Sequence, residues 1–218
     1  EVERQVAVRT ADLEAALEAR TLLLHEVDHR VKNNLTMIGA LLRLQARSLD
    51  DPALAATLDS MMERVDALAT VHRRLYQSQD ITRFDIGALV ETLACDIIGS
   101  TGRSNIELST ELAPVMVSSS HASPLGLIVN ELLPHAVPHA YAKGRGGQLT
   151  VTANARDGRG RITVRDDGPG MATEGAGAGL GRTLVERLSK QVSGAVAWSP
   201  APGGGVEAVV DFPLADTP

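Results

Sequence analysis

A histidine that projects from a helix is the residue of this chain best suited to covalent chemistry. At about 100° per helical residue, with Leu24 as the centre of the apolar stripe, His29 falls roughly 140° away and Asn33 roughly 180° away, so both side chains face water. An accessible imidazole can act as a nucleophile, and the neighbouring cations Arg30 and Lys32 can meet an incoming phosphate. A histidine that is simply solvated fits the same pattern, and helical geometry alone leaves that alternative open.

Two long helices are the elements that position this histidine. The first 78 residues contain one glycine and one proline, Pro52, and their apolar side chains recur at spacings of three or four. This pattern indicates amphipathic helices that end near Ser48 and near Gln77. Asp51 and Pro52 are typical of the N-cap and first position of the second helix. Because two helices alone leave much of their apolar stripe in water, we expect a homodimer in which two hairpins form a four-helix bundle.

The rest of the chain has the pattern of an α/β sandwich. Helices are predicted over residues 86–98, from 123 onward and over 182–193, and strands over 105–112, 115–118, 148–155, 161–166, 195–199 and 206–212. Helices and strands in this order pack as helices on a mixed sheet. The expected fold class is therefore α+β, a helical hairpin followed by an α/β sandwich, with residues 78–82 as the hinge.

Composition excludes several function classes. The chain has 21 Lys and Arg against 27 Asp and Glu, a net charge of −6, and only 2% aromatic residues, so nucleic acid is not an expected partner. The lone cysteine, Cys95, fits a reducing compartment, and the cytoplasm is the expected location. No run approaches the roughly 20 apolar residues of a membrane span. We expect no membrane segment in this stretch, and its being the cytoplasmic part of a longer, membrane-anchored sensor stays open.

Two short motifs in the first half carry a family resemblance. Residues 29–35 read His-Arg-Val-Lys-Asn-Asn-Leu, and residues 41–45 read Leu-Leu-Arg-Leu-Gln. They resemble the dimerisation and phosphoacceptor segment of the second histidine-kinase subfamily of bacterial two-component signalling. The resemblance implies that His29 becomes phosphorylated and passes the phosphoryl group to an aspartate on the receiver domain of a response regulator. It implies that Asn33 orients water to dephosphorylate the regulator, while a solvated or capping amide stays the alternative.

The same resemblance divides the chain into three parts. Residues 1–20 correspond to a signalling helix that carries an input signal, and residues 21–78 to the dimerisation and phosphoacceptor domain. Residues 83–218 correspond to an ATP-binding domain of the Bergerat type, which is shared with gyrase-like and chaperone ATPases. ATP and Mg²⁺ are the implied cofactors.

Two glycine-rich motifs resemble the nucleotide boxes of that domain. The first, at residues 166–170, follows a predicted strand; the resemblance implies that Asp166 accepts a hydrogen bond from the adenine amino group while the glycines let backbone approach the base. The second, at residues 177–181, opens a predicted helix whose free N–H groups receive phosphates. The glycines implied in nucleotide binding are Gly168, Gly170, Gly177, Gly179 and Gly181.

A third motif begins with Asn130 and Glu131 and departs from the family pattern. Glu131 matches the base of relatives that hydrolyse ATP. Family members carry an asparagine where this chain has His135, and that asparagine ligates the magnesium ion that bridges the phosphates. Imidazole is a poor substitute for a hard oxygen ligand, so a degenerate magnesium position with weakened metal binding is expected. A bound water that restores the site is the alternative.

Two prolines lie in the same predicted helix. Pro134 and Pro138 each remove a helix hydrogen bond and clash with the preceding turn, at about 3 kcal/mol in a helix interior. The sequence therefore predicts that the helix kinks or ends near Leu133, which would disturb the geometry of Glu131.

Three functions compete at this point. The first is a histidine kinase in which His29 takes a phosphoryl group from ATP and transfers it to a response regulator. The second is an ATP-independent phosphotransferase or response-regulator phosphatase that uses His29 and Asn33 beside a degenerate ATPase domain. The third is an adaptor that binds a receiver domain without exchanging phosphate, and the presence of His29 weighs against it.

Overall fold

The computed structural model describes two compact units, which divide the chain into Glu1–Gln79 and Asp80–Pro218. The described residues are 2–77, 83–100, 105–140, 146–170 and 180–214. The predicted hinge at residues 78–82 lies outside them.

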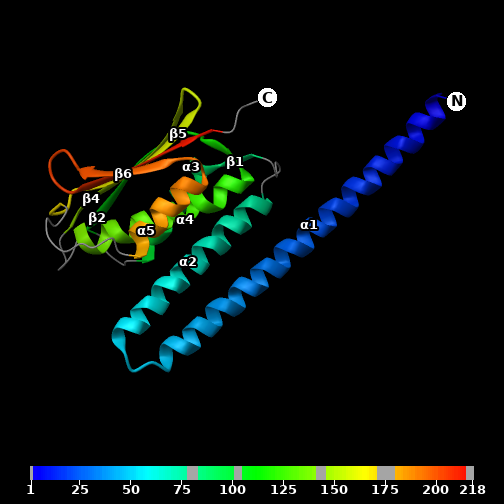
Figure 1. Cartoon of the computed structure of the whole chain (residues 1–218). Coiled ribbons are helices and arrows are strands. Elements are labelled where there is room, and N and C mark those ends of the chain that lie inside the picture. The colour runs from blue at the N-terminus through cyan, green and yellow to red at the C-terminus, as the bar shows by residue number, and fades with distance from the viewer. Residues whose placement is uncertain (1, 78–82, 101–104, 141–145, 171–179, 215–218) are drawn as a thin grey trace. The chain divides into compact units, whose positions relative to one another are not determined.

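The first unit is a helical hairpin of α1 (Val2–Arg47) and α2 (Pro52–Gln77), in which α2 runs back along the second half of α1 (Figure 1). Both helices end within a residue of the predicted positions. The Oδ1 atom of Asp51 accepts a hydrogen bond from the N–H of Leu54 at 3.4 Å, which confirms the predicted N-cap of α2. No helix in the described ranges is long and apolar enough to cross a lipid bilayer.

One face of α1 supplies the packing within the hairpin. Gly39 is buried and Val31, Leu35 and Leu42 are half-buried, at helical spacings of three or four. Further apolar side chains form a row along and beside this face of α1 that stays exposed. Its members are Val6, Leu13, Leu17, Val27, Ile38 and Leu41, each between 43% and 72% exposed. The hairpin by itself therefore leaves a long apolar surface in water.

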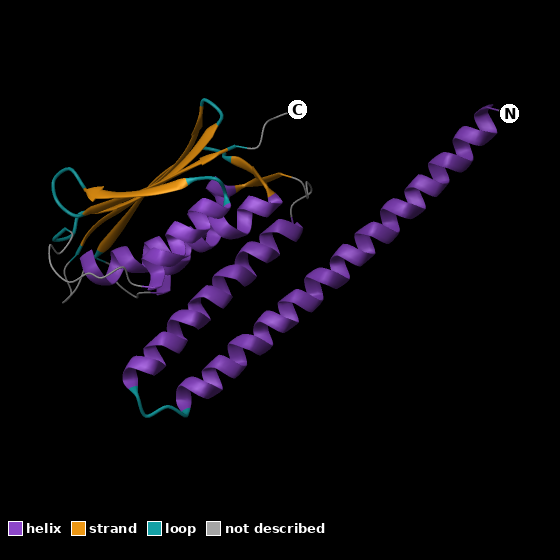
Figure 2. Ribbon diagram, in the orientation of Figure 1, coloured by secondary structure: helices purple, strands orange, loops and turns teal. Residues whose placement is uncertain are grey.

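The second unit places three helices on one face of a mixed sheet (Figure 2). Its elements are β1 (Arg83–Asp85), α3 (Ile86–Ser100), β2 (Ile106–Leu112), β3 (Met116–Ser118), α4 (Ser119–Ala140), β4 (Gly147–Arg156), β5 (Arg159–Asp166), α5 (Leu180–Gln191), β6 (Ala195–Pro200) and β7 (Val206–Pro213). The five-stranded sheet has the order β2-β4-β5-β7-β6, with β2 and β4 parallel and the other neighbours antiparallel. This arrangement is the predicted α/β sandwich.

The core lies between this sheet and its helices. Alternate residues of the central strands, such as Ile162 on β5 and Val210 on β7, are fully buried, while their neighbours face the other side. The short pair of β1 and β3 was not fully predicted, because residues 83–85 are too few to show a strand period. Asp85 joins the pair to α3, since its Oδ1 accepts hydrogen bonds from the N–H groups of Gly87 and Val115, both at 3.0 Å.

Helix α4 corrects one prediction. It begins at Ser119, one turn before the predicted start, and it continues through Pro134 and Pro138 to Ala140 instead of ending near Leu133. The last residues before the first proline are anchored in the core, because Leu132 and Leu133 are 2% and 0% exposed. Burying a leucine contributes about 1.5–3 kcal/mol, so a few such contacts offset the cost of about 3 kcal/mol for one proline.

Candidate phosphoacceptor and nucleotide sites

His29 and Asn33 form the first candidate site, on an exposed face of α1. Both side chains are exposed, as predicted from helical geometry. They lie one helical turn apart, and the amide nitrogen Nδ2 of Asn33 is 3.3 Å from the ring nitrogen Nδ1 of His29. The structure therefore brings together the two residues of this site that the sequence singled out.

The cation next to His29, Arg30, forms a salt bridge with Glu26. The guanidinium of Arg30 donates two hydrogen bonds to Oε1 of Glu26, from Nε at 3.0 Å and from Nη2 at 2.6 Å. Both side chains are mostly exposed, so the pair adds little to helix stability. Its effect is on the site: the charge of Arg30, predicted to meet a phosphate, is balanced by Glu26. Sequence reasoning missed Glu26, although an acid four residues before an arginine is the signal for such a pair.

Asp166 forms the centre of the second candidate site, at the end of β5. Its side chain is 7% exposed. Its Oδ1 accepts hydrogen bonds from the N–H of Gly168 at 2.9 Å and from the N–H of Val206 at 3.3 Å. These bonds fix the carboxylate between two segments that are 40 residues apart in the sequence. Gly170 has φ +88, a left-handed conformation that favours glycine, so this motif provides the backbone freedom expected of it.

Gly205 approaches Asp166 from the β6–β7 turn, and sequence reasoning missed it. A Cβ on Gly205 would lie 2.6 Å from the carbonyl carbon of Asp166 and 2.8 Å from its Oδ1, so only glycine fits. Three consecutive glycines, at residues 203–205, all have positive φ. The run of glycines was the available signal, but its target could not be read from the sequence.

Asn130 and Glu131 lie on α4, which packs against β5. They are 8% and 6% exposed, and with Asp166 they make up three of the four buried polar or charged side chains in the described part of the chain. The fourth is Ser189 on α5. Burying a polar group costs free energy unless a hydrogen bond or an opposite charge compensates it, so buried polar side chains are rare outside sites with a structural or functional role. The three were predicted from the sequence as site residues.

The remaining predicted residues are only partly within the described structure. Gly177 and Gly179 lie outside the described residues. Gly181 is buried in the first turn of α5, where it was predicted. His135 belongs to α4, but its side chain lies outside the description. Among the described residues, no group of three or more His, Cys, Asp or Glu side chains is placed to hold a metal ion.

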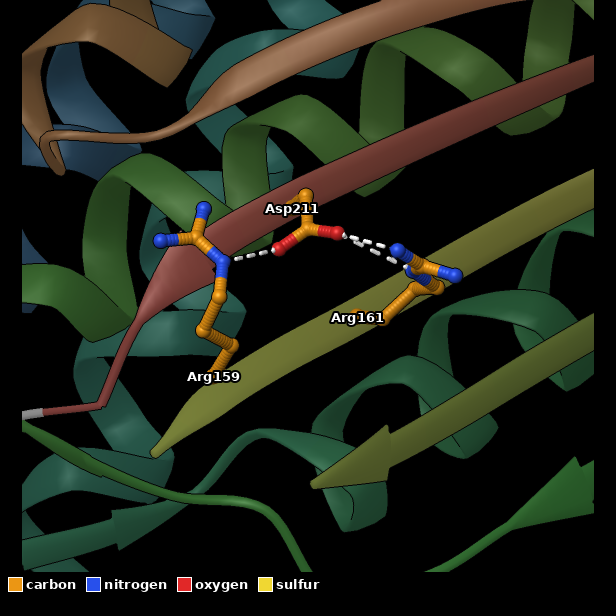
Figure 3. Close-up of polar contacts among 3 residues, drawn as sticks. All are labelled: Arg159, Arg161 and Asp211. Atoms are coloured by element: carbon orange, nitrogen blue, oxygen red, sulfur yellow. Dashed lines mark hydrogen bonds and ion pairs between the residues drawn. The ribbon is translucent and has the colours of Figure 1, made fainter. Parts of the chain in front are cut away.

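A cluster of charges on the opposite face of the sheet is separate from these sites (Figure 3). Nε of Arg159 donates to Oδ1 of Asp211 at 2.7 Å, and Nε of Arg161 donates to Oδ2 at 3.1 Å. Burial raises the pKa of the Asp211 carboxyl, but the hydrogen bonds from Arg161 and Arg159 and their positive charges outweigh burial and lower this pKa overall. The cluster joins β5 to β7 and has a structural role.

A helical hairpin followed by a sandwich with a buried acidic site at a strand end defines a histidine kinase core with a Bergerat-type ATPase domain. Comparison with known proteins supports both parts of this classification. Residues 26–101 match a family model described as histidine kinase, and residues 120–216 match one described as histidine kinase-, DNA gyrase B- and HSP90-like ATPase. The chain therefore contains a histidine kinase segment with the His-Arg-Val-Lys-Asn-Asn motif and a histidine kinase-like ATPase domain, and proteins similar to it are sensor histidine kinases.

Individual relatives support this assignment. The chain is 31% identical over 186 residues to blue-light-activated histidine kinase 2 of Erythrobacter litoralis, covering 78% of this chain and 52% of that protein. It is 27% identical over 220 residues to sensor histidine kinase PdtaS of Mycolicibacterium smegmatis, covering 91% and 41%. The solved histidine kinase domain of Erythrobacter litoralis EL346 superposes with a TM-score of 0.65 at 29% identity, covering 88% of this chain and 90% of that one. The chain thus spans about half or less of the length of these curated relatives.

Proposed function

We propose that this chain is the catalytic core of a sensor histidine kinase, in which His29 takes the γ-phosphoryl group of ATP and passes it to an aspartate of a response-regulator receiver domain. The observation that carries the proposal is the burial of Asn130, Glu131 and Asp166, the polar residues at positions that the family uses for nucleotide and metal. Residues 21–78 would serve as the phosphoacceptor domain and residues 83–218 as the ATP-binding domain.

The residues present fit a nucleotide. Asp166 offers a fixed carboxylate to the adenine amino group, and the left-handed Gly170 lets backbone approach the base. Asn130 and Glu131 offer the hard oxygen donors that Mg²⁺ prefers. When bound, Mg²⁺ would neutralise charge on the phosphates. Gly181 and the flanking predicted glycines would receive the phosphates at the start of α5.

His29 performs the chemistry in two steps. In the first, a lone pair on its ring forms a bond to the γ-phosphorus as the bond from that phosphorus to the bridging oxygen breaks, and ADP leaves. In the second, the carboxylate of the regulator aspartate forms an O–P bond as the N–P bond breaks, and the neutral imidazole is regenerated. The exposure of His29 supports both steps, since a donor and an acceptor must reach the ring in turn.

A second role is proposed for Asn33: it orients a water molecule that attacks the phosphorus of the phosphorylated regulator, so that the O–P bond breaks and inorganic phosphate and a free aspartate are released. Its exposed amide, one turn from His29, supports this role. A function restricted to ATP-independent transfer is not favoured, because the ATPase domain matches its family over residues 120–216. Helix α4 also continues beyond Glu131 to Ala140 and does not end near Leu133.

The exposed apolar row on α1 supports a homodimer. A second copy could cover residues such as Leu13, Leu17, Ile38 and Leu41 by completing a four-helix bundle. The receiver domain would then bind near the exposed face that carries His29.

Two measurements test the proposal. Calorimetry with a non-hydrolysable ATP analogue and Mg²⁺ should show binding to the wild type and a loss of at least tenfold in Asp166→Asn. The matched control is Asp167→Asn, because Asp167 accepts a hydrogen bond from the Gln148 N–H at 3.0 Å and an amide oxygen can also accept it. A phosphorylated receiver domain should then form from labelled ATP with wild type and not with His29→Ala. Equal binding by both aspartate variants, or an unlabelled receiver with wild type, would contradict the proposal.

A further inference from the structure

The contact between Asn33 and His29 bears on which ring nitrogen reacts. A neutral imidazole carries one N–H and one lone pair, and the partner of one nitrogen decides which of the two keeps the proton. Among the described side chains, Asn33 is the only hydrogen-bond partner of the His29 ring, through Nδ1 at 3.3 Å. The nearby carboxylate of Glu26 is engaged by Arg30. The amide of Asn33 is therefore the group placed to set the tautomer.

The two ends of the amide have opposite effects. When Nδ2 of Asn33 faces the ring, it donates to Nδ1, which puts the ring proton on Nε2 and leaves no free lone pair for attack. When Oδ1 faces the ring, it accepts the Nδ1–H, and Nε2 presents its lone pair to solvent. A half-turn of the exposed amide exchanges the two states, and the two ends have nearly the same shape. In both states Nδ1 is covered.

We propose that Asn33 is a positioning residue for autophosphorylation: it directs the phosphoryl group to Nε2 of His29 by covering Nδ1 and, through Oδ1, by holding the proton there. This inference rests on the proposed function. In the step it describes, the Nε2 lone pair forms the N–P bond, the bond between the γ-phosphorus and the bridging oxygen breaks, and ADP leaves with that electron pair. The Nδ1 proton stays on the ring, hydrogen-bonded to Asn33, until solvent removes it.

The experiment uses potassium phosphoramidate as donor, because it phosphorylates histidine without the ATP site and releases ammonia. The two phosphohistidine isomers are separated by ³¹P NMR of the whole chain, and signals that vanish in His29→Ala belong to that residue. Wild type should give the Nε2 isomer alone. Asn33→Leu should give a mixture, because a solvent-exposed hydrogen bond shifts a population by about threefold to tenfold. Asn33→Asp, which keeps an acceptor beside Nδ1, should restore the Nε2 isomer.

Asn34→Ala is the matched control, since Asn34 is also exposed but lies about 100° further round α1. It should give the wild-type isomer ratio. An unchanged ratio in Asn33→Leu, or an equal change in Asn34→Ala, would overturn the inference. Absence of label from ATP in wild type, together with an isomer ratio that depends on Asn33, would instead overturn the kinase function and support the positioning role.

Discussion

The backbone of Gly205 lies against Asp166, so closely that a side chain at position 205 would overlap the carbonyl group and crowd the carboxylate of the aspartate. The N–H of the next residue, Val206, donates to the same carboxylate at 3.3 Å. The β6–β7 turn thus holds the adenine-binding acid of the proposed nucleotide site in place. The last residue of β5, Asp166, is therefore held in place by the first residue of β7, Val206.

Replacing Gly205 should weaken nucleotide binding and also lower the stability of the fold. We expect Gly205→Ala to displace Asp166 and weaken nucleotide binding at least tenfold, with a loss of about 1–3 kcal/mol in unfolding free energy from overpacking. Gly203→Ala is the control: Gly203 also has φ +88, but a Cβ there meets nothing within 4 Å. Calorimetry and denaturant unfolding of both variants check this. Equal nucleotide affinities would show that the turn does not position the aspartate.

Restoring the family's asparagine at position 135 should strengthen Mg²⁺-dependent nucleotide binding. Because an amide oxygen is a better Mg²⁺ ligand than imidazole, His135→Asn should tighten Mg²⁺-dependent nucleotide binding by about tenfold. Binding without Mg²⁺ should stay the same. His139→Asn, one turn further along α4, serves as the control. The two variants are compared by titration with and without the metal, and a similar response in both would refute the assignment.

The salt bridge between Glu26 and Arg30 predicts an electrostatic effect on His29. Glu26→Gln should release Arg30 and raise the rate of phosphorylation by an anionic donor by about twofold to fivefold at low salt. The increase should shrink as salt screens the charge. Glu63→Gln is the control, because it makes the same change in net charge at an exposed position of the other helix, α2. If the two variants have the same rate, the local pairing has no role.

The apolar row on α1 predicts self-association. A charge within this row should oppose its burial, so Leu41→Glu is expected to convert a dimer into a monomer at micromolar concentration, as measured by sedimentation equilibrium. Leu22→Glu is the control, because Leu22 is also exposed but lies roughly 160° round α1 from the centre of the row. A wild-type chain that sediments as a monomer would refute the dimer.

The charge cluster on the sheet predicts a pH dependence of stability. The pKa of Asp211 is lowered from its ordinary 3.8, so its contribution is present above that pH and is lost as the pH falls through the lower folded value. At pH 7, Asp211→Asn should lower the unfolding free energy by about 1 kcal/mol, and the difference from wild type should disappear in acid. Asp157→Asn, in an exposed pair with Arg156, should have almost no effect at either pH. Urea titrations at several pH values provide the test.

Local patterns predicted most of the fold. The bounds of α1 and α2 followed from apolar periodicity and from the Asp51–Pro52 cap, which act within a few residues of the chain. What local patterns did not predict was set by distant contacts. The strand β1 exists because it pairs with β3, more than 30 residues away. Helix α4 continues past Pro134 because the core holds its leucines, which no local propensity describes.

In the candidate sites, too, local patterns could be predicted from the sequence and contacts between distant residues could not. The outward position of His29 followed from its place on a helix, and Asp166 followed from its motif. The role of Gly205 could not be predicted, because its neighbour is about 40 residues earlier in the chain. The salt bridge between Glu26 and Arg30 could have been predicted from the sequence, since a spacing of four residues between opposite charges on a helix is a local signal.

Site-resolved mass spectrometry tests the central claim most directly. The whole chain is incubated with ATP and Mg²⁺, digested at neutral to mildly alkaline pH, where phosphohistidine survives, and each phosphorylated residue is located within its peptide. The account predicts phosphate on His29 and on no other histidine, and none in Asp166→Asn. Phosphate on a different residue, or an unmodified His29 in a chain that binds the nucleotide, would contradict it.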